Sequence, residues 1–577
     1  MHLIFFALLG LACLPTAYCA PEYCPLLGPV FPAPKNISQD PAFRAATKNI
    51  SEALSDCING DTSTKAFLNP DSTSVALQIF SADRPAPLFG SYYTASSARN
   101  ASLGVNKVDG NTVFRIGSIS KLWTMLLLLI EKGDIIFDEP VIKYVPELED
   151  AINDMHNATQ ELNTVDHVRW GEVTIGELAS HLAGISRQYG VGDYALQLKD
   201  PEAAGLPKLT KEELPPCGAT AACDRADFFN GLLKQRPVVA TGATPIYSNA
   251  AFRILGYALE KMTNTSYEDL LTRHLIKPLK LTHSSYSAPD AKYGIIPGDA
   301  ATSSWGVNIG EETPSAGGVY ASPNDLSAVG RAILNNTLLP PAITRRWLKP
   351  VSHTSSLALA IGSPWEIFSF PNARVVDLYT KAGDIGAYSS MIALSPDHGV
   401  GFNILAAGEK THEVVSYLSD YVATSILPTL DQIAQRAADQ RFSGTYVARD
   451  TNSTITISTD DGPGLKVTNW TKGDIRIFEA LSKFYGDESP ADLEVRLYPT
   501  GLETDSRISF RAVVQDTGKH LPGIGPFTSS CFTWVTVDGM QYNGVGMDEF
   551  VFDVDEKGRA VRVSPRAWQY VLERAYV

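Results

Sequence analysis

The stretch that most constrains the fold of this chain is a long apolar run within residues 114–133. In Leu122–Ile130 only Thr124 is not apolar, so every face of a helix formed here is hydrophobic. Gly117 allows a sharp turn into this helix, and Gly133 stands where glycine commonly ends one. Because the run is too short to span a bilayer, we expect a helix buried in the core of a globular domain.

Two polar residues, Ser118 and Lys121, stand at the front of this helix, and we expect Ser118 to be its first residue. Their spacing of three places them on one helical face. A serine hydroxyl becomes a good nucleophile only when a base takes its proton. A buried lysine can be that base, since burial lowers its pKa. The Ser-x-x-Lys pattern also arises by chance in a chain of this length, so it needs support from other segments.

Two later segments carry the same kind of chemistry. Tyr247-Ser248-Asn249 offers a phenol that can move protons and an amide that can both donate to and accept from a substrate. Lys381-Ala382-Gly383-Asp384 follows an apolar strand, and its glycine leaves room for a substrate beside a backbone N–H. Taken alone, the first reads more simply as a loop with a packed tyrosine and the second as a strand end with a solvated lysine.

Together these three segments, in this order, resemble the serine β-lactamase and penicillin-binding protein superfamily. The nearest branch contains class C β-lactamases, D-aminopeptidases and family VIII esterases. Residues 178–185 and 315–322 resemble two further segments of that branch, so the likeness covers roughly residues 70–430. It implies an α/β (α+β) domain of the β-lactamase/transpeptidase-like fold, with an antiparallel sheet and a helical subdomain. The rest of the chain resembles secreted fungal members that carry a lipocalin-like C-terminal domain.

The resemblance also implies catalytic roles. Ser118 would be the acylated nucleophile, and Lys121 would take its proton or tune its neighbours. Tyr247 would act as general base in acylation and then protonate the leaving group. His181, within the segment 178–185, reads more simply as a structural residue at a helix end than as a catalytic one.

A second set of residues would bind the substrate. Asn249 and Lys381 would hold the substrate and the phenolate, and Gly383 would let the substrate lie against the strand. The N–H groups of Ser118 and Asp384 would form the oxyanion hole. This chain departs from the family pattern at Ala382, which replaces a hydroxyl residue, and at Asp384, which adds a negative charge. Both favour esters, acyl groups or amides without a nearby carboxylate.

Three functions fit these residues. The first is a serine hydrolase that acts through an acyl-enzyme on ester or amide bonds of small molecules. The second is an acyltransferase that passes the same acyl group to an alcohol or amine in natural-product biosynthesis. The third is a non-catalytic binding protein of the same fold, which the presence of both Ser118 and Lys121 disfavours.

The chain of 577 residues is long enough for two large domains. We expect a signal peptide at 1–19, a leader at 20–70, the β-lactamase-like domain at 71–435 and a barrel domain at 441–577. Cleavage after Ala20 and an N-terminal membrane anchor are the alternatives to cleavage after Cys19. Export agrees with eight glycosylation sequons, which begin at Asn36, Asn49, Asn100, Asn157, Asn264, Asn335, Asn452 and Asn469.

The net charge of −15 argues against nucleic acid or an anionic membrane surface as a partner. We expect a small ester or amide as substrate, no stable membrane anchor, and no cofactor. We also expect no metal, since no Cys-x-x-Cys or His-x-x-x-His cluster occurs. In an oxidising compartment the order of the cysteines favours the pairs Cys24–Cys57 and Cys217–Cys223, with Cys531 left over.

Alternating apolar residues predict strands at both ends of the first domain, and helical patterns lie between them. The expected strands are Val75–Phe80, Leu88–Tyr93, Thr112–Ile116, Val375–Thr380, Tyr388–Leu394 and Val400–Ala406. The expected helices are Phe43–Ile58, Val173–Ile185, a helix ending near Leu233, Asn249–Met262, Tyr267–Leu279, Asp325–Leu334 and His412–Ser425. The barrel strands are expected at Thr454–Ile457, Leu465–Val467, Ile475–Phe478, Leu493–Leu497, Ile508–Val513, Phe532–Val535, Phe550–Asp553 and Ala560–Val563.

Overall fold

The computed structural model describes residues 23–59, 68–157, 163–218, 222–307, 314–371, 374–484, 489–518, 527 and 531–575. The chain forms two compact units. The larger unit contains Lys35–Pro371 and Val376–Leu430. The smaller contains Asp431–Val577 together with the described parts of Met1–Pro34 and Asn372–Val375. The expected signal peptide at 1–19 lies outside the described residues.

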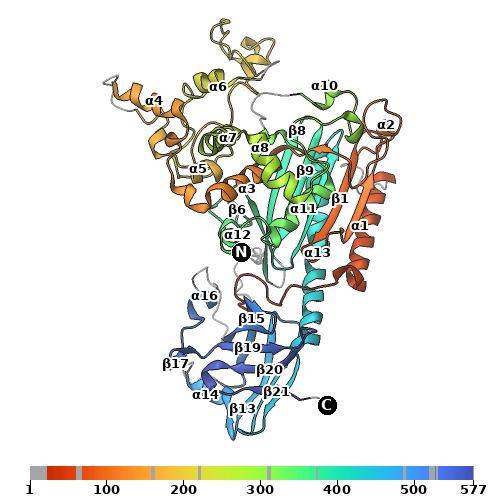
Figure 1. The fold of residues 1–577 in the computed structure, drawn as a ribbon, viewed down its shortest axis with the longest axis vertical. Helices are drawn as coiled ribbons and strands as arrows, with labels where there is room; N and C mark the ends of the chain where they lie inside the picture. The colour runs from red at the N-terminus through yellow and green to blue at the C-terminus, as the bar shows by residue number, and fades with distance from the viewer. Residues whose placement is uncertain are drawn as a thin grey trace, which may run out of the picture. The chain divides into compact units, whose positions relative to one another are not determined.

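The larger unit is built on an eight-stranded antiparallel sheet of order β2-β1-β10-β9-β8-β7-β6-β5 (Figure 1). Its first strand, β1, pairs with β10, so strands from both ends of the unit meet, as the sequence predicts. Every residue of β1 and β10 is buried, because both faces of the sheet are covered. The strands are β1 Ser74–Ser81, β2 Phe89–Tyr93, β5 Ser352–His353, β6 Leu359–Ile361, β7 Glu366–Pro371, β8 Val375–Ile385, β9 Tyr388–Ser395 and β10 Val400–Ala407.

Helices fill the long connection between β2 and β5 and cover the sheet (Figure 1). α11 packs on β1, β9 and β10, and the side chain of its cap, Ser322, accepts the N–H of Asp325. The helices are α1 Pro41–Asn59, α2 Ser96–Arg99, α3 Ser120–Lys132, α4 Pro146–Asn157, α5 Ile175–Ala179, α6 Arg225–Leu232, α7 Asn249–Thr263, α8 Tyr267–Leu271, α9 Lys277–Leu279, α10 Ala300–Ser303, α11 Pro323–Leu334, α12 Pro341–Trp347 and α13 Thr411–Phe442.

Single turns connect many of these helices. The 3₁₀ turns are η1 Ile37–Gln39, η2 Gly117–Ile119, η3 Asp134–Asp138, η4 Val141–Lys143, η5 Trp170–Glu172, η6 Tyr194–Leu196, η7 Glu202–Ala204 and η9 Ala291–Tyr293. Two wider π turns are η8 Thr272–Ile276 and η10 Pro314–Gly318. A short ladder joins β3 Phe114–Arg115 to β4 Tyr320–Ala321.

The buried helix predicted at the apolar run is α3, whose residues from Ser120 to Leu129 are all buried. The prediction that Ser118 is its first residue is wrong. Gly117 adopts a φ of +49°, and the chain makes the 3₁₀ turn η2 before the α-helix begins. Ser118 therefore lies in a tight turn between β3 and α3.

The smaller unit is the predicted antiparallel barrel. β11, β21, β20, β19, β16, β15, β13 and β12 follow one another, and the pairing of β12 with β13 closes the ring. β14 adds to β13, and β17 pairs only with β18. The strands are β11 Gly444–Ala448, β12 Ser453–Ser458, β13 Leu465–Lys472, β14 Ile475–Arg476, β15 Leu493–Thr504, β16 Arg507–Asp516, β17 Gln541–Tyr542, β18 Val545–Gly546, β19 Glu549–Val554, β20 Ala560–Pro565 and β21 Leu572–Arg574; η11 is Arg566–Trp568.

One predicted barrel strand, Ile475–Phe478, is only half right, since β14 ends at Arg476, and another, Phe532–Val535, is wrong. After β14 the chain turns into the helix α14, Ile477–Phe484, because Ile477 and Leu481 are one turn apart and can be buried together. The segment 532–535 contains the short helix α16, Thr533–Thr536, in which only Thr533 is buried. Alternation over four residues does not separate such helices from strands.

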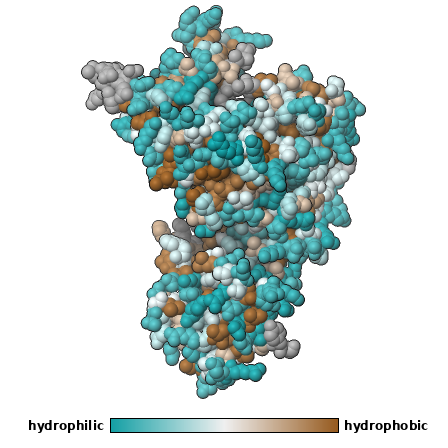
Figure 2. Space-filling model, viewed as in Figure 1, coloured by the Kyte–Doolittle hydropathy of each residue, from teal (hydrophilic) through white to brown (hydrophobic). Residues whose placement is uncertain are grey.

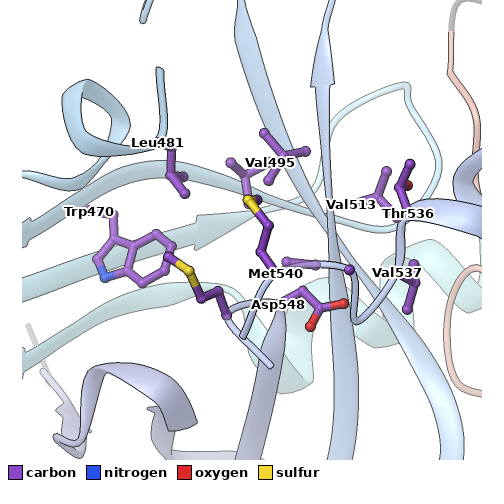
Figure 3. A pocket seen from close by; sticks show the side chains of 12 residues that line it. Trp470, Leu481, Val495, Val513, Thr536, Val537, Met540 and Asp548 are labelled. Atoms are coloured by element: carbon purple, nitrogen blue, oxygen red, sulfur yellow. The ribbon is translucent and has the colours of Figure 1, made fainter. Parts of the chain in front are cut away.

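Side chains fill the space beside the barrel strands. A cavity of about 30 Å³ is lined by Trp470, Val495 and Met540 among others, and Figure 3 shows these side chains. A space of this size has room for one or two water molecules. This cavity is therefore too small for a ligand much larger than water.

Two disulfides occur in the described part of the chain. Cys217–Cys223 is confirmed, with the Cα atoms 5.0 Å apart. The predicted pair Cys24–Cys57 is wrong, since Cys24 is bonded to Cys531 with a Cα–Cα distance of 5.5 Å. The N–H of Cys24 donates to the side chain of Gln515, so the start of the chain lies along the barrel unit. Sequence order cannot reveal this approach, because it depends on where the chain returns in space.

The surface agrees with an aqueous environment. Polar side chains dominate the face shown in Figure 2, with scattered apolar patches. Seven sequon asparagines are exposed, and the side chain of the eighth, Asn157, lies outside the described residues. Over the part of the chain that the structure describes, no helix is long and apolar enough to cross a membrane.

Candidate active site

Three elements bring the predicted site residues together (α3, α7 and β8 in Figure 1). Ser118 lies in η2, and Lys121 lies in the first turn of α3. Tyr247 directly precedes Ser248, whose side chain caps α7, and Asn249 is the first residue of that helix. Lys381, Gly383 and Asp384 lie on β8.

The hydroxyl of Ser118 contacts both predicted bases. Its Oγ is 2.5 Å from the phenol oxygen of Tyr247, and it accepts a hydrogen bond of 3.0 Å from the ammonium of Lys121. These distances allow direct proton transfer from the hydroxyl. The structure thus places a nucleophile and two candidate bases in one cluster.

Lys121 is fully buried and fully bonded. Besides Ser118, its Nζ donates to Oδ1 of Asn249 at 2.8 Å and to the carbonyl of Ala316 at 2.5 Å. Burial lowers the pKa of Lys121, the phenol of Tyr247 opposes this, and the charge of Lys381 adds to the lowering. Loss of the proton is therefore easier for this lysine than for one in water.

Tyr247 lies among positive groups. The Nζ atoms of Lys121 and Lys381 are 5.0 and 5.4 Å from the centre of its ring. Burial alone would raise the pKa of Tyr247, but the charges of Lys121 and Lys381 and the hydrogen bond with Ser118 outweigh it, so the pKa is lowered. Since the phenolate and the ammonium groups stabilise one another, these residues titrate as a coupled set.

Lys381 has a carboxylate partner that the sequence did not reveal. Its Nζ donates to Oε1 of Glu366 on β7 at 2.5 Å, and the N–H of Ala382 donates to Oε2 of the same carboxylate at 2.9 Å. Burial lowers the pKa of Lys381, but Glu366 and Tyr247 outweigh it, so the pKa is raised. Lys381 therefore stays charged beside Tyr247.

Glycines let β8 pass close to Ser118. A Cβ on Gly383 would lie 2.2 Å from the carbonyl oxygen of Ile116 and 2.7 Å from the backbone nitrogen of Ser118. A Cβ on Gly117 would lie 2.7 Å from the backbone nitrogen of Asp384. The two amides predicted for an oxyanion hole thus belong to backbone segments in direct contact. No side chain other than hydrogen fits at either glycine.

The side chain of Asp384 lies apart from the serine cluster. It accepts a hydrogen bond from the hydroxyl of Ser389 at 2.6 Å and faces Nδ1 of His412 at 3.2 Å. About half of this side chain is exposed, so the carboxylate adds a negative charge at the solvent side of β8.

His181 is buried against the site without contacting Ser118. Its Nδ1 accepts the N–H of Ser248 at 3.1 Å, and its ring centre is 4.5 Å from that of Tyr247. Burial and the charges of Lys121 and Lys381 lower the pKa of His181 well below its usual range, so the ring is neutral. It packs beside the phenol and holds the start of α7.

Glu366 and Arg187 are the site residues that sequence reasoning missed. A buried lysine such as Lys381 needs a negatively charged partner, so the sequence predicts that some Asp or Glu lies beside it. The sequence does not indicate which of the many acidic residues that is. Arg187 lies in an irregular segment after α5, where no periodicity indicates its direction. Across the described residues, no group of three His, Cys, Asp or Glu side chains could hold a metal ion.

The fold and this cluster define a β-lactamase-like hydrolase. A family model described as beta-lactamase matches residues 89–424, which is more than half of the chain. The chain therefore belongs to the beta-lactamase family. A second model, described as beta-lactamase-like-like, C-terminal domain, matches residues 434–576.

Two relatives of similar length match most of the chain. A beta-lactamase-like protein of Arthroderma benhamiae is 30% identical, with 94% of each chain covered. A probable hydrolase, M10, of a Phoma species is 27% identical, covering 89% of this chain and 87% of the relative. Among solved structures, the D-alanine carboxypeptidase AmpC of Burkholderia cenocepacia is 19% identical with a TM-score of 0.46, covering 66% of this chain and 99% of that one. The predicted superfamily and fold class are confirmed by the family models.

Proposed function

We propose that this protein is a secreted serine hydrolase that cleaves ester or amide bonds of small molecules through an acyl-enzyme on Ser118. The observation that carries the proposal is the double contact of the Ser118 hydroxyl, 2.5 Å from Tyr247 and 3.0 Å from Lys121. A hydroxyl held between two groups of lowered pKa is primed to lose its proton.

In the first half of the reaction, the Tyr247 phenolate takes the proton of Ser118 while Oγ attacks the substrate carbonyl. The oxyanion that forms accepts hydrogen bonds from the N–H groups of Ser118 and Asp384, a type of contact worth about 3 kcal/mol each to the transition state. Tyr247 then passes the proton to the leaving group. Water then hydrolyses the acyl-enzyme. Tyr247 takes a proton from the attacking water and returns it to Oγ of Ser118 when the acyl group leaves.

The charges of the cluster support this assignment. Lys381, held charged by Glu366, stabilises the phenolate that must exist before attack. Lys121 is tied to the amide of Asn249, so that amide keeps its orientation toward the cluster. The relative named as a probable hydrolase supports hydrolysis as the reaction type.

The test is covalent labelling of the mature protein. p-Nitrophenyl acetate or butyrate is expected to add one acyl group, detected by intact-mass spectrometry, and a fluorophosphonate probe is expected to label the same site. Ser118→Ala is the control and should show neither adduct. A wild-type protein that stays unlabelled by the fluorophosphonate would overturn the proposal.

Export is tested separately. Expression of the full chain in a eukaryotic secretory host should release a protein whose first residue is Ala20, with sugars on the exposed sequons. The two disulfides of the described residues are compatible with an oxidising compartment. Retention of the uncleaved chain in the cell would contradict secretion.

A further inference from the structure

We propose that Arg187 is an anion-binding subsite next to the Ser118 cluster, so that the preferred substrate is an ester or amide that carries a carboxylate. This inference rests on the proposed function and names its substrate class. The anion would sit beside Tyr247 and Asn249, away from β8.

Backbone hydrogen bonds hold Arg187 beside the start of α7. Its carbonyl accepts the N–H groups of Asn249 at 2.8 Å and of Ala250 at 3.1 Å, the first two residues of α7. The carbon at the centre of its guanidinium is 4.8 Å from the centre of the Tyr247 ring. Contact with an aromatic ring orients the guanidinium group and leaves the N–H donors on its edge free to bind an anion.

The neighbouring segments hold this position. Ser186 offers its carbonyl to the Ser248 hydroxyl at 2.8 Å, which ties the segment to the cap of α7. A Cβ on Gly190 would lie 2.8 Å from the carbonyl oxygen of Cys217 and 3.2 Å from Sγ of Cys223, so the disulfide loop packs directly on the end of the segment. A binding group that is held in place beforehand loses less entropy when a ligand arrives.

Arg187 is the cation of the cluster that remains open to a substrate. The ammonium of Lys121 already donates to three acceptors. The ammonium of Lys381 donates to Glu366 and to the carbonyl of Ala382. Both lysines are buried. Arg187 is exposed, and among the described residues no carboxylate lies within ion-pair distance of it.

The charges on β8 favour the same orientation of the substrate. Glu366 already neutralises Lys381, and Asp384 adds a half-exposed carboxylate on β8. A negatively charged substrate group is repelled from β8 and attracted to Arg187. The guanidinium can bind a carboxylate through two parallel hydrogen bonds, which neutral groups cannot match.

The experiment compares matched p-nitrophenyl esters: butyrate, glutarate with a free carboxylate, and 4-(trimethylammonio)butyrate. A butyrate ester of 4-hydroxybenzoate places the carboxylate in the leaving group instead. For wild type, kcat/KM should be highest with one of the two anionic esters. In Arg187→Gln the ratio of anionic to neutral kcat/KM should fall about tenfold, mainly through KM, as expected for one lost charged hydrogen-bonding partner. Added salt should shrink the wild-type ratio.

Two further variants test whether the anion preference depends on the positive charge at position 187. Arg187→Lys keeps the charge and should restore part of the ratio, whereas Arg236→Gln, an exposed arginine paired with Asp166, should keep the wild-type ratio. An equal loss with all esters in Arg187→Gln would overturn the proposal, as would wild-type preference for the neutral or cationic ester. Fluorophosphonate labelling of wild type is run alongside. If labelling fails, the acyl-enzyme proposal has failed, whereas if it succeeds without anion preference, only the subsite has failed.

Discussion

Tyr247 is the single side chain on which the proposed proton transfers depend, since it is 2.5 Å from the Ser118 hydroxyl and has a lowered pKa. We expect Tyr247→Phe to lower kcat by roughly 10²-fold or more with little change in KM, because the variant loses a general base but keeps the ring. Steady-state kinetics with p-nitrophenyl butyrate measures this. Activity within a few-fold of wild type would remove Tyr247 from the mechanism.

We expect Lys381 to set the pH range of the proposed reaction. In the proposed mechanism Tyr247 acts when deprotonated, so kcat/KM should rise with pH through the pKa of Tyr247. Lys381 lowers that pKa, and therefore Lys381→Gln should move the acid limb of the pH–rate profile to higher pH. Because Lys381→Gln leaves Glu366 without its cation, the double variant Lys381→Gln/Glu366→Gln serves as control and should shift the limb in the same direction. A limb that stays in place or moves to lower pH contradicts this role.

At the level of elements, the close contact between β8 and η2 predicts that a larger side chain at position 383 disrupts the site by its size alone. In Gly383→Ala the new Cβ would meet the backbone of Ile116 and Ser118, so the strand and the turn must separate. We expect a loss of at least tenfold in kcat, measured with the same ester, because misplaced donors stabilise the oxyanion poorly. Gly171→Ala is the matched control, since its Cβ would meet only the side chain of Ile152 at 3.7 Å. Similar kinetics for both variants would contradict the close contact.

The sequence predicted those elements whose pattern reflects their own burial. β1, β9, β10, α3, α7 and α11 are continuous or periodic apolar segments with clear end signals, and each was predicted within a few residues. β7 was missed and α14 was mistaken for a strand, because each is defined by its neighbours more than by its own residues. The same limit applies at the site. Ser118, Lys121, Tyr247 and Lys381 were found through order and spacing, whereas Glu366 is identified only by its contact with Lys381.

For the molecule as a whole, the Cys24–Cys531 bond joins the start of the described chain to the barrel across 507 residues of sequence. Cys24→Ser/Cys531→Ser should lower the free energy of unfolding of the barrel unit by about 2–4 kcal/mol, because the open chain gains conformational freedom. Differential scanning calorimetry should show its transition at a lower temperature. The Cys217–Cys223 bond closes a loop of only 6 residues, so its removal in Cys217→Ser/Cys223→Ser should cost less. An unchanged barrel transition in the first variant would contradict the prediction.

The closed ring of the barrel affects how copies of the protein meet one another. β12 is paired on one side with β11 and on the other with β13, so the row of amide and carbonyl groups that an open sheet would expose is already used. An exposed row of that kind is the usual starting point for strand-by-strand fibril growth. The ring should therefore let the protein reach high concentrations without its barrel strands recruiting those of a neighbour.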